Sequence, residues 1–133
     1  MNAQPQKVLV IEDEIPVQQL LNRLLKRLGY EATITSDGAQ ALEILADRPE
    51  EYALVITDLI LPNCTGWEFL SFLKDNALCS HIKTLVISGI TTSGEERERL
   101  HHLADQIMSK GDFTIAAFEE MLNELFPNTD PSA

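Results

Sequence analysis

Acidic, hydroxyl and lysine side chains stand directly after apolar stretches of this sequence. Asp58 follows the run 53–57, whose aliphatic and β-branched residues are typical of a strand buried on both faces. A buried strand has no structural need for an acid at its tip, and an unpaired carboxylate there would be costly. Other polar residues end further apolar runs in the same way, and the resulting candidates for chemistry are Glu12, Asp13, Asp58, Ser88 and Lys110.

The three acids among these residues suggest a cation site. Carboxylates that crowd together repel one another, so they need a bound cation or raised pKa values. Hard oxygen ligands that stay open to water suit Mg²⁺ better than a soft metal. One Mg²⁺ and the Lys110 ammonium would balance the charges of Glu12, Asp13 and Asp58, and such a site favours a phosphoryl group held by both cations. From its own stretch alone, Asp58 could equally serve only to turn the chain toward Pro62.

Five apolar runs alternate with five stretches of helical periodicity. The expected strands are 7–11, 31–35, 53–57, 84–88 and 106–109. The expected helices begin near Pro16, Ala39, Trp67, Glu95 and Ala117. Gly29 is suited to end the first helix, and Thr65 with Glu68 forms a capping-box pattern before the third. Ser93 with Glu96 repeats that pattern before the fourth helix.

This alternation predicts a parallel sheet with helices on both faces. A closed eight-fold barrel needs about 250 residues, so we expect a doubly wound α/β fold of the flavodoxin type, with five strands in the order 2-1-3-4-5 and five flanking helices. In that order Asp13 and Asp58 would face each other across the switch point between the first and third strands. The chain is expected to form a single domain over residues 1–133, with a core of about 7–126 and polar tails at both ends.

Composition narrows the class of protein. A hydrophobic content of 44% and a charged content of 23% are those of an ordinary soluble globular protein. The formal net charge of -11 argues against direct binding of nucleic acid. No apolar run reaches membrane-spanning length, and residues 1–6 are too polar for a signal peptide. Cys64 and Cys79 lack metal or redox spacing, so free thiols and a cytoplasmic location are expected.

Taken together, the motifs resemble those of the receiver domain of two-component response regulators. The resemblance extends from Lys7 to Phe126, with its pieces in the family's order. The pieces are Val10-Ile11-Glu12-Asp13-Glu14, Thr57-Asp58 with Pro62 and Gly66 following, Val86-Ile87-Ser88-Gly89, and Ser109-Lys110. The resemblance implies that Asp58 is the phosphoacceptor, and that a histidine kinase or a histidine phosphotransfer protein donates the phosphoryl group from a phosphohistidine.

The resemblance also implies roles for the residues around the acceptor. The implied Mg²⁺ ligands are Glu12 (through water), Asp13, Asp58 and the backbone carbonyl of Ile60. Ser88 would donate a hydrogen bond to the phosphoryl group, and Lys110 would pair with it. The protein would then be a signalling domain that catalyses its own phosphorylation and slow dephosphorylation, and that presents a switched surface to a downstream protein, rather than an enzyme with a separate substrate.

Two positions depart from the family's pattern. Ile107 stands where the family usually has an aromatic residue that moves with Ser88, and Gly111 follows the lysine where proline is usual. A cis bond before a residue other than proline costs about 2.5–4 kcal/mol, so a trans bond is expected before Gly111. Because isoleucine has no ring to present, we expect phosphorylation to be signalled by residues 88–93 and the polar helix 95–103.

Three other functions share parts of this pattern. A flavin-binding flavodoxin relative would need a phosphate loop after the first strand, where Glu12-Asp13-Glu14 would repel a phosphate. A Mg²⁺-dependent aspartyl-phosphate hydrolase normally carries a second acid two residues after the first, a place that Ile60 occupies. A receiver-like interaction module without phosphorylation would not need the full set of acids, hydroxyl and lysine that this sequence retains.

Other conspicuous side chains are expected to be structural. Trp67 has helical spacing with Leu70 and is expected in the core. His101 and His102 are adjacent, so they point to different sides of a helix and make a poor metal pair. Cys64 is expected to be an exposed thiol in the loop after the third strand, with no neighbour that would lower its pKa.

Overall fold

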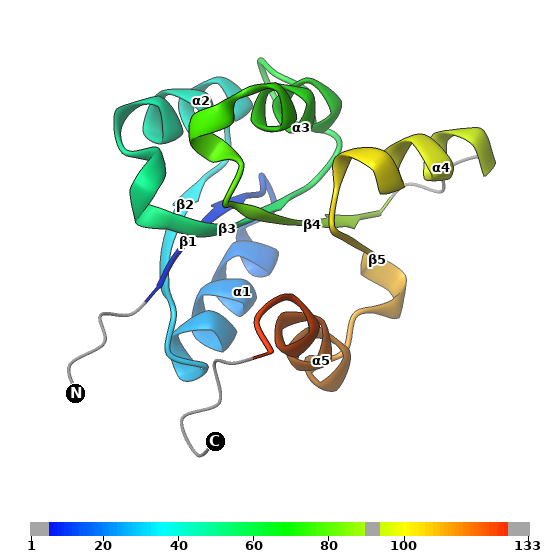
Figure 1. Ribbon diagram of the computed structural model, residues 1–133. Helices are drawn as coiled ribbons and strands as arrows, with labels where there is room; N and C mark the ends of the chain where they lie inside the picture. Colours follow the sequence, from blue (N-terminus) through cyan, green and yellow to red (C-terminus); the bar gives the residue numbers. More distant parts are fainter. Residues whose placement is uncertain (1–5, 90–93, 128–133) are drawn as a thin grey trace.

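A parallel β-sheet forms the centre of the molecule (Figure 1). The computed structural model describes residues 6–89 and 94–127, and within them five strands lie in the order β2-β1-β3-β4-β5. The strands are β1 (Lys7–Ile11), β2 (Glu31–Thr35), β3 (Tyr52–Thr57), β4 (Lys83–Ser88) and β5 (Gln106–Ser109). The doubly wound fold predicted from the sequence is therefore confirmed.

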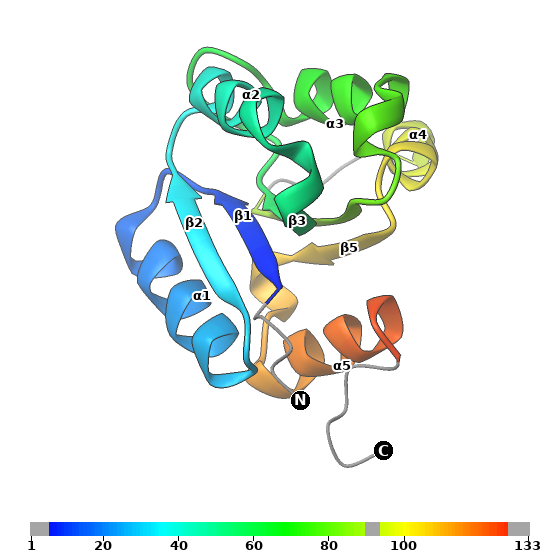
Figure 2. The same cartoon turned by 60° about the vertical axis from the view of Figure 1, so that its left-hand side comes forward.

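Helices cover both faces of this sheet. They are α1 (Ile15–Arg27), α2 (Gly38–Asp47), α3 (Gly66–Asp75), α4 (Gly94–Leu103) and α5 (Ile115–Leu125). Figures 1 and 2 show α1 and α5 on one side of the sheet and α2, α3 and α4 on the other. Three short 3₁₀ helices lie between these elements, namely η1 (Pro49–Glu51), η2 (Ala77–Cys79) and η3 (Lys110–Asp112).

Successive residues of β1 face the two layers of helices. Val10 belongs to a core cluster with Leu25 of α1 and Phe118 of α5. Its neighbour Ile11 belongs to a second cluster with Phe69 of α3. Because both faces of the inner strands are covered, these strands read as continuous apolar runs with no polar alternation.

The predicted signals at two helix ends are confirmed. Gly29 follows α1 with a φ of 93°, a left-handed conformation that glycine adopts without a steric penalty. At the start of α3, the Thr65 hydroxyl accepts a hydrogen bond from the Glu68 amide at 3.1 Å, and the Glu68 carboxylate accepts one from the Thr65 amide at 3.3 Å. This reciprocal capping box fixes where the loop after β3 ends.

Packing against a neighbouring loop decides which small residues of α2 are buried. Ala39 and Ala46 are exposed, whereas Gly38 and Ala41 are buried with Leu45. Small residues fit either face of a helix, so alanine alone does not reveal which face is buried. The tertiary structure decides it, because α2 packs at Gly38 directly against the backbone of the loop after β3.

The helix α4 contributes little to the core. Leu100 is its one buried residue, and the residues of its first two turns are exposed. This agrees with the polar composition noted above, whereas the capping box expected at Ser93 lies outside the described residues, as does most of the expected tail at 127–133. Within the described residues, no helix is long and apolar enough to cross a membrane.

Gly66, at the start of α3, lies against the backbone just after β3. A Cβ atom at this position would stand 2.3 Å from the Asp58 carbonyl oxygen and 2.7 Å from the Leu59 Cα. Backbone atoms of a packed loop cannot move aside as a flexible side chain can. The glycine therefore allows α3 to approach the residue at the tip of β3.

We predict that Gly66→Ala lowers the free energy of unfolding by about 1–3 kcal/mol, since overpacking forces the backbone to shift. Gly94→Ala is the matched control, because a Cβ there meets nothing within 4 Å and alanine favours a helix. Urea unfolding of both variants measures the difference. Equal stabilities of the two variants would contradict the close approach at Gly66.

Candidate functional site

The carboxyl ends of the inner strands bring four acids together at one edge of the sheet. One carboxylate oxygen from each of Glu12, Asp13, Glu14 and Asp58 lies within 4.8 Å of the others. The first three follow β1 and the fourth follows its neighbour β3. Asp13 and Asp58 thus lie close to each other across the switch point of the sheet, as the predicted strand order requires.

Asp58 has its two carboxylate oxygens in different surroundings. Its side chain is buried, and Oδ1 accepts hydrogen bonds from the amides of Leu59 at 2.6 Å and Ile60 at 3.3 Å. Oδ2 lies 2.9 Å from Nζ of Lys110. The backbone therefore orients one oxygen, and the other faces a cation.

Lys110 is the cation at the centre of the acidic cluster. Besides Asp58, its ammonium lies 2.6 Å from Glu14 and 3.2 Å from Glu12. Burial acts to lower the pKa of this lysine, but its hydrogen bonds to Glu14, Asp58 and Glu12 outweigh burial and raise the pKa. The ammonium is therefore charged over the whole physiological range of pH.

Glu12 is the most deeply buried acid of the cluster, with 2% of its surface exposed. Burial raises the pKa of this carboxyl, although the Glu14 amide and Lys110 both donate hydrogen bonds that lower it. The backbone of Glu12 is held as well, because the Gln18 side chain of α1 donates to its carbonyl oxygen at 2.5 Å. The loop after β1 is thus tied to α1.

The donor set of the cluster fits a hard divalent cation. Carboxylate oxygens are ligands that Mg²⁺ prefers. Asp13 and Glu14 are exposed, so the site opens to water on one side, while Glu12 and Asp58 are buried on the other. A single lysine does not balance four carboxylates, and a divalent cation would reduce the remaining negative charge.

Sequence reasoning did not assign a role to Glu14, which makes the shortest of the three ion pairs of Lys110. The sequence shows Glu14 in the acidic run after β1. Adjacent side chains of a loop need not point the same way, so the sequence did not predict its contact with Lys110. Ile60, whose carbonyl was the expected metal ligand, has a side chain that is 60% exposed beside the cluster.

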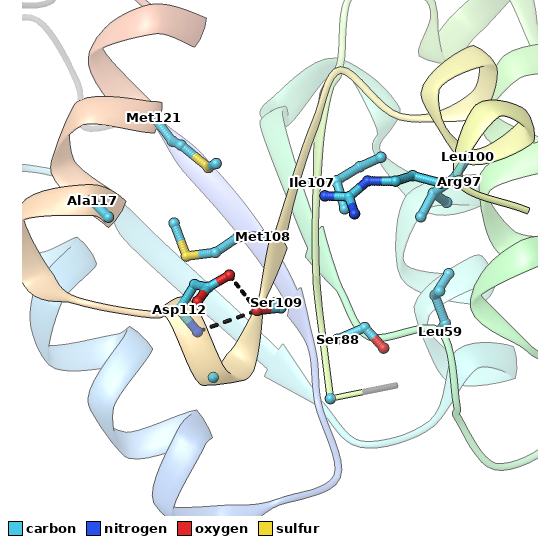
Figure 3. A pocket seen from close by; sticks show the side chains of 12 residues that line it. Leu59, Ser88, Arg97, Leu100, Ile107, Met108, Ser109, Asp112, Ala117 and Met121 are labelled. Atoms are coloured by element: carbon cyan, nitrogen blue, oxygen red, sulfur yellow. Dashed lines mark hydrogen bonds between the residues drawn. The ribbon is translucent and has the colours of Figure 1, made fainter. Parts of the chain in front are cut away.

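Ser88 and Ile107 line a common cavity of about 520 Å³ (Figure 3). Ser88 ends β4 and is buried, and Ile107 of β5 is half-buried beside α4. Figure 3 shows Arg97 of α4 beside Ile107, and Met121 of α5 across β5. The bond before Gly111 is trans, as expected, since the described residues contain no cis peptide.

The other conspicuous side chains follow the predictions except at Cys64. His101 and His102 are exposed. Trp67 is half-buried, packs at the edge of the core and has the Arg99 guanidinium 4.9 Å from its ring centre. Cys64 is only 7% exposed, so the expectation of an exposed thiol was wrong. The loop folds inward to pack on α2, and burial raises the pKa of the thiol.

Comparison with curated proteins identifies relatives in several kingdoms. The chain is 32% identical over 83 residues to the 3',5'-cyclic-nucleotide phosphodiesterase regA of Dictyostelium discoideum, but this match spans 62% of the chain and only 10% of regA. It is 30% identical over 93 residues to the polar-differentiation response regulator DivK of Brucella anthropi, a match that covers 69% of the chain and 73% of DivK. The first relatives are thus much longer proteins, whereas DivK is of similar size.

Solved structures with the same fold include two receiver domains. The response regulator receiver domain (CheY-like) from Methylobacillus flagellatus superposes with a TM-score of 0.75 and 27% identity, over 91% of this chain and 98% of that one. The receiver domain of the sensor histidine kinase PA1611 from Pseudomonas aeruginosa was solved with a magnesium ion in its active site cleft. It superposes with a TM-score of 0.79 and 22% identity, over 93% of this chain and 99% of that one.

The family comparison covers most of the described chain. The model of the response regulator receiver domain matches residues 8–123, from the start of β1 to the last turns of α5. This span contains all four acids of the cluster together with Ser88 and Lys110. By this match and by its likeness to DivK, the chain belongs to the family of response regulator receiver domains.

Proposed function

We propose that Asp58 is the phosphoacceptor of this receiver domain. The observation that carries the proposal is the geometry of its carboxylate. Oδ1 is held by two backbone amides, and Oδ2 faces the Lys110 ammonium at 2.9 Å. A nucleophile that is already oriented and already beside a cation needs little reorganisation when a phosphoryl group arrives.

We also propose that the acidic cluster holds Mg²⁺. The ligands would be Asp13, Asp58 and the Ile60 carbonyl, with Glu12 acting through water, and the magnesium-bound PA1611 receiver domain supports the assignment by analogy. When bound, the ion neutralises charge on the transferring phosphoryl group. Glu14 lies within the same 4.8 Å set and adds negative charge that favours the ion.

The proposed reaction is an in-line phosphoryl transfer. Oδ2 of Asp58 attacks the phosphorus of a phosphohistidine, an O–P bond forms, the P–N bond breaks, and the nitrogen of the departing imidazole keeps the electron pair and takes a proton from solvent. The Lys110 ammonium moves from the carboxylates to an oxygen of the phosphoryl group. The Ser88 hydroxyl, on the neighbouring strand, donates a second hydrogen bond to that group. Positioning and charge neutralisation supply most of the catalysis.

In the cell, the phosphoryl donor would be a histidine kinase or a histidine phosphotransfer protein. A further protein in the cytoplasm would bind the phosphorylated domain and receive the signal. The proposal treats residues 1–133 as a single receiver domain with its core at about 7–126, which agrees with the one continuous sheet of the described residues. The domain then transfers a phosphoryl group to itself and slowly loses it, without turnover of a separate substrate.

We predict that incubation with a small phosphodonor and Mg²⁺ adds one phosphoryl group, and that Asp58→Asn abolishes the addition. The asparagine keeps the size of the side chain but removes the nucleophilic charge. Intact mass measurement detects the product. Asp75→Asn, an exposed aspartate at the end of α3, is the matched control and should label normally. Undiminished labelling of the Asp58→Asn variant would place the acceptor elsewhere.

A second prediction concerns the metal. Mg²⁺ at 100 times its dissociation constant should stabilise the fold by about 2.7 kcal/mol. Asp13→Ala should remove most of this dependence and raise the stability of the metal-free protein, because it removes one of several like charges. Urea unfolding in Mg²⁺ and in EDTA measures both effects, with Asp75→Ala as the control. If the free energy of unfolding of the parent protein did not change with Mg²⁺, the cluster would not be a metal site.

The readout of phosphorylation is proposed to run through α4. Ile107 is β-branched, with restricted side-chain rotation, and can be buried equally well in both states. A group with the same energy in both states shifts no population. By contrast, Leu100 is the one buried residue of α4, so this helix is the easiest of the five to displace.

Hydrogen exchange with and without the acyl-phosphate mimic beryllofluoride tests this readout. We expect the largest changes in protection in the amides of residues 94–103, which belong to α4. The amides of α1, whose Leu21, Leu24 and Leu25 are buried, serve as an internal control. Changes confined to β5 and α5, with α4 silent, would reject the proposed readout.

A further inference from the structure

The turn that carries Lys110 is closed by a pair of side-chain hydrogen bonds (Figure 3). The Ser109 hydroxyl donates to Oδ2 of Asp112 at 3.0 Å and accepts from the Asp112 amide at 3.2 Å. The turn is the 3₁₀ helix η3, which begins at Lys110 and has Ser109 as its N-cap. The Phe113 amide completes it by donating to the Lys110 carbonyl at 3.3 Å.

The residue after Lys110 gives the turn no rigidity of its own. Gly111 has no side chain, and a Cβ placed there would meet only the Ser109 hydroxyl, at 4.0 Å. Glycine loses more conformational freedom on ordering than any other residue, so other contacts must hold its neighbours. A proline would not serve in this turn, because it disfavours the helical conformation in the residue before it, which is Lys110.

The Ser109–Asp112 pair stands beside the reactive groups without being one of them. Ser109 pairs in register with Ser88 across β4 and β5, and it immediately precedes Lys110. The Lys110 ammonium must reach Asp58 past the end of β4, at the end of a flexible four-carbon stem. Fixing the backbone at the base of that stem reduces the entropy lost when the ammonium is held in place.

We infer that Ser109 and Asp112 are positioning residues for Lys110, and that their hydrogen bonds do here what a rigid residue after the lysine would otherwise do. The inference rests on the proposed phosphoacceptor function. A pair that only stabilised the fold would act on all properties of the protein together. A positioning pair acts on what Lys110 does at the site, beyond any effect on the stability of the fold.

Ser109→Val and Ser109→Thr form the matched test, since the two side chains have nearly the same shape and only threonine keeps the hydroxyl. We expect the valine variant to be phosphorylated by a small phosphodonor about tenfold more slowly, and the threonine variant to match the parent. Asp112→Ala, which removes the acceptor, should behave as the valine variant does. Equal rates in the valine and threonine variants would overturn the inference.

A double-mutant cycle separates positioning from general stability. In a Lys110→Ala background, Ser109→Val should slow phosphorylation no further, because the group that it positions is gone. If the losses in activation free energy caused by the two substitutions simply added in the double variant, the inference would be overturned. Ser109 is exposed and ends an outer strand, so the valine variant is expected to fold, and urea unfolding checks this.

The reactivity of the lysine amine gives a readout that does not depend on phosphorylation. Peptide mass mapping after brief treatment with an amine-acylating reagent should show Lys110 reacting faster in Ser109→Val than in the parent, relative to the exposed Lys26 of α1. Unchanged relative reactivity would contradict the inference. If the parent protein took no phosphoryl group while this reactivity changed, the proposed function would fail and the positioning role of Ser109 would stand.

Discussion

The contact of one ammonium with three carboxylates is the interaction on which the architecture of this protein depends. Lys110 follows β5, whereas Glu12 and Glu14 follow β1 and Asp58 follows β3, so the contact exists only when all three strand ends converge. Glu12 and Asp58 are buried, and an uncompensated buried carboxylate is strongly destabilising. The cluster still carries excess negative charge, which favours a divalent cation; in the proposed function that cation and Lys110 would compensate the charge of the phosphoryl group.

The sheet brings the reactive side chains together at one edge, and the loops after the strands orient them. Because β1 and β3 are buried on both faces, helices must lie on both sides, and parallel connections then place every carboxyl end at one edge. Within that edge each reactive group has its own local support. Two amides orient Asp58, Gly66 lets α3 approach behind it, the Gln18 side chain holds the backbone of Glu12, and the Ser109–Asp112 pair closes the turn of Lys110.

Stability is unevenly distributed around the site. α1 and α5 share one large core cluster with the sheet, whereas α4 contributes Leu100 to a separate, smaller cluster. Elements with few buried apolar contacts open at the lowest free energy. In the proposed readout, a change at the strand edge would be transmitted at least cost toward the cavity between α4, β5 and α5, which Ser88 and Ile107 both line.

The apolar runs that end in polar residues predicted the five strands, their order and the proximity of Asp13 to Asp58. They could do so because a strand buried on both faces of a parallel sheet appears in the sequence as a continuous apolar run. Short-range signals such as Gly29 and the Thr65 capping box were equally readable. Only the tertiary structure decided which face of α2 is buried, that Cys64 turns inward, that Glu14 pairs with Lys110, and that Ser109 closes the lysine's turn. These features depend on how segments distant in sequence, or single rotamers in loops, pack against one another, and no periodicity records such contacts.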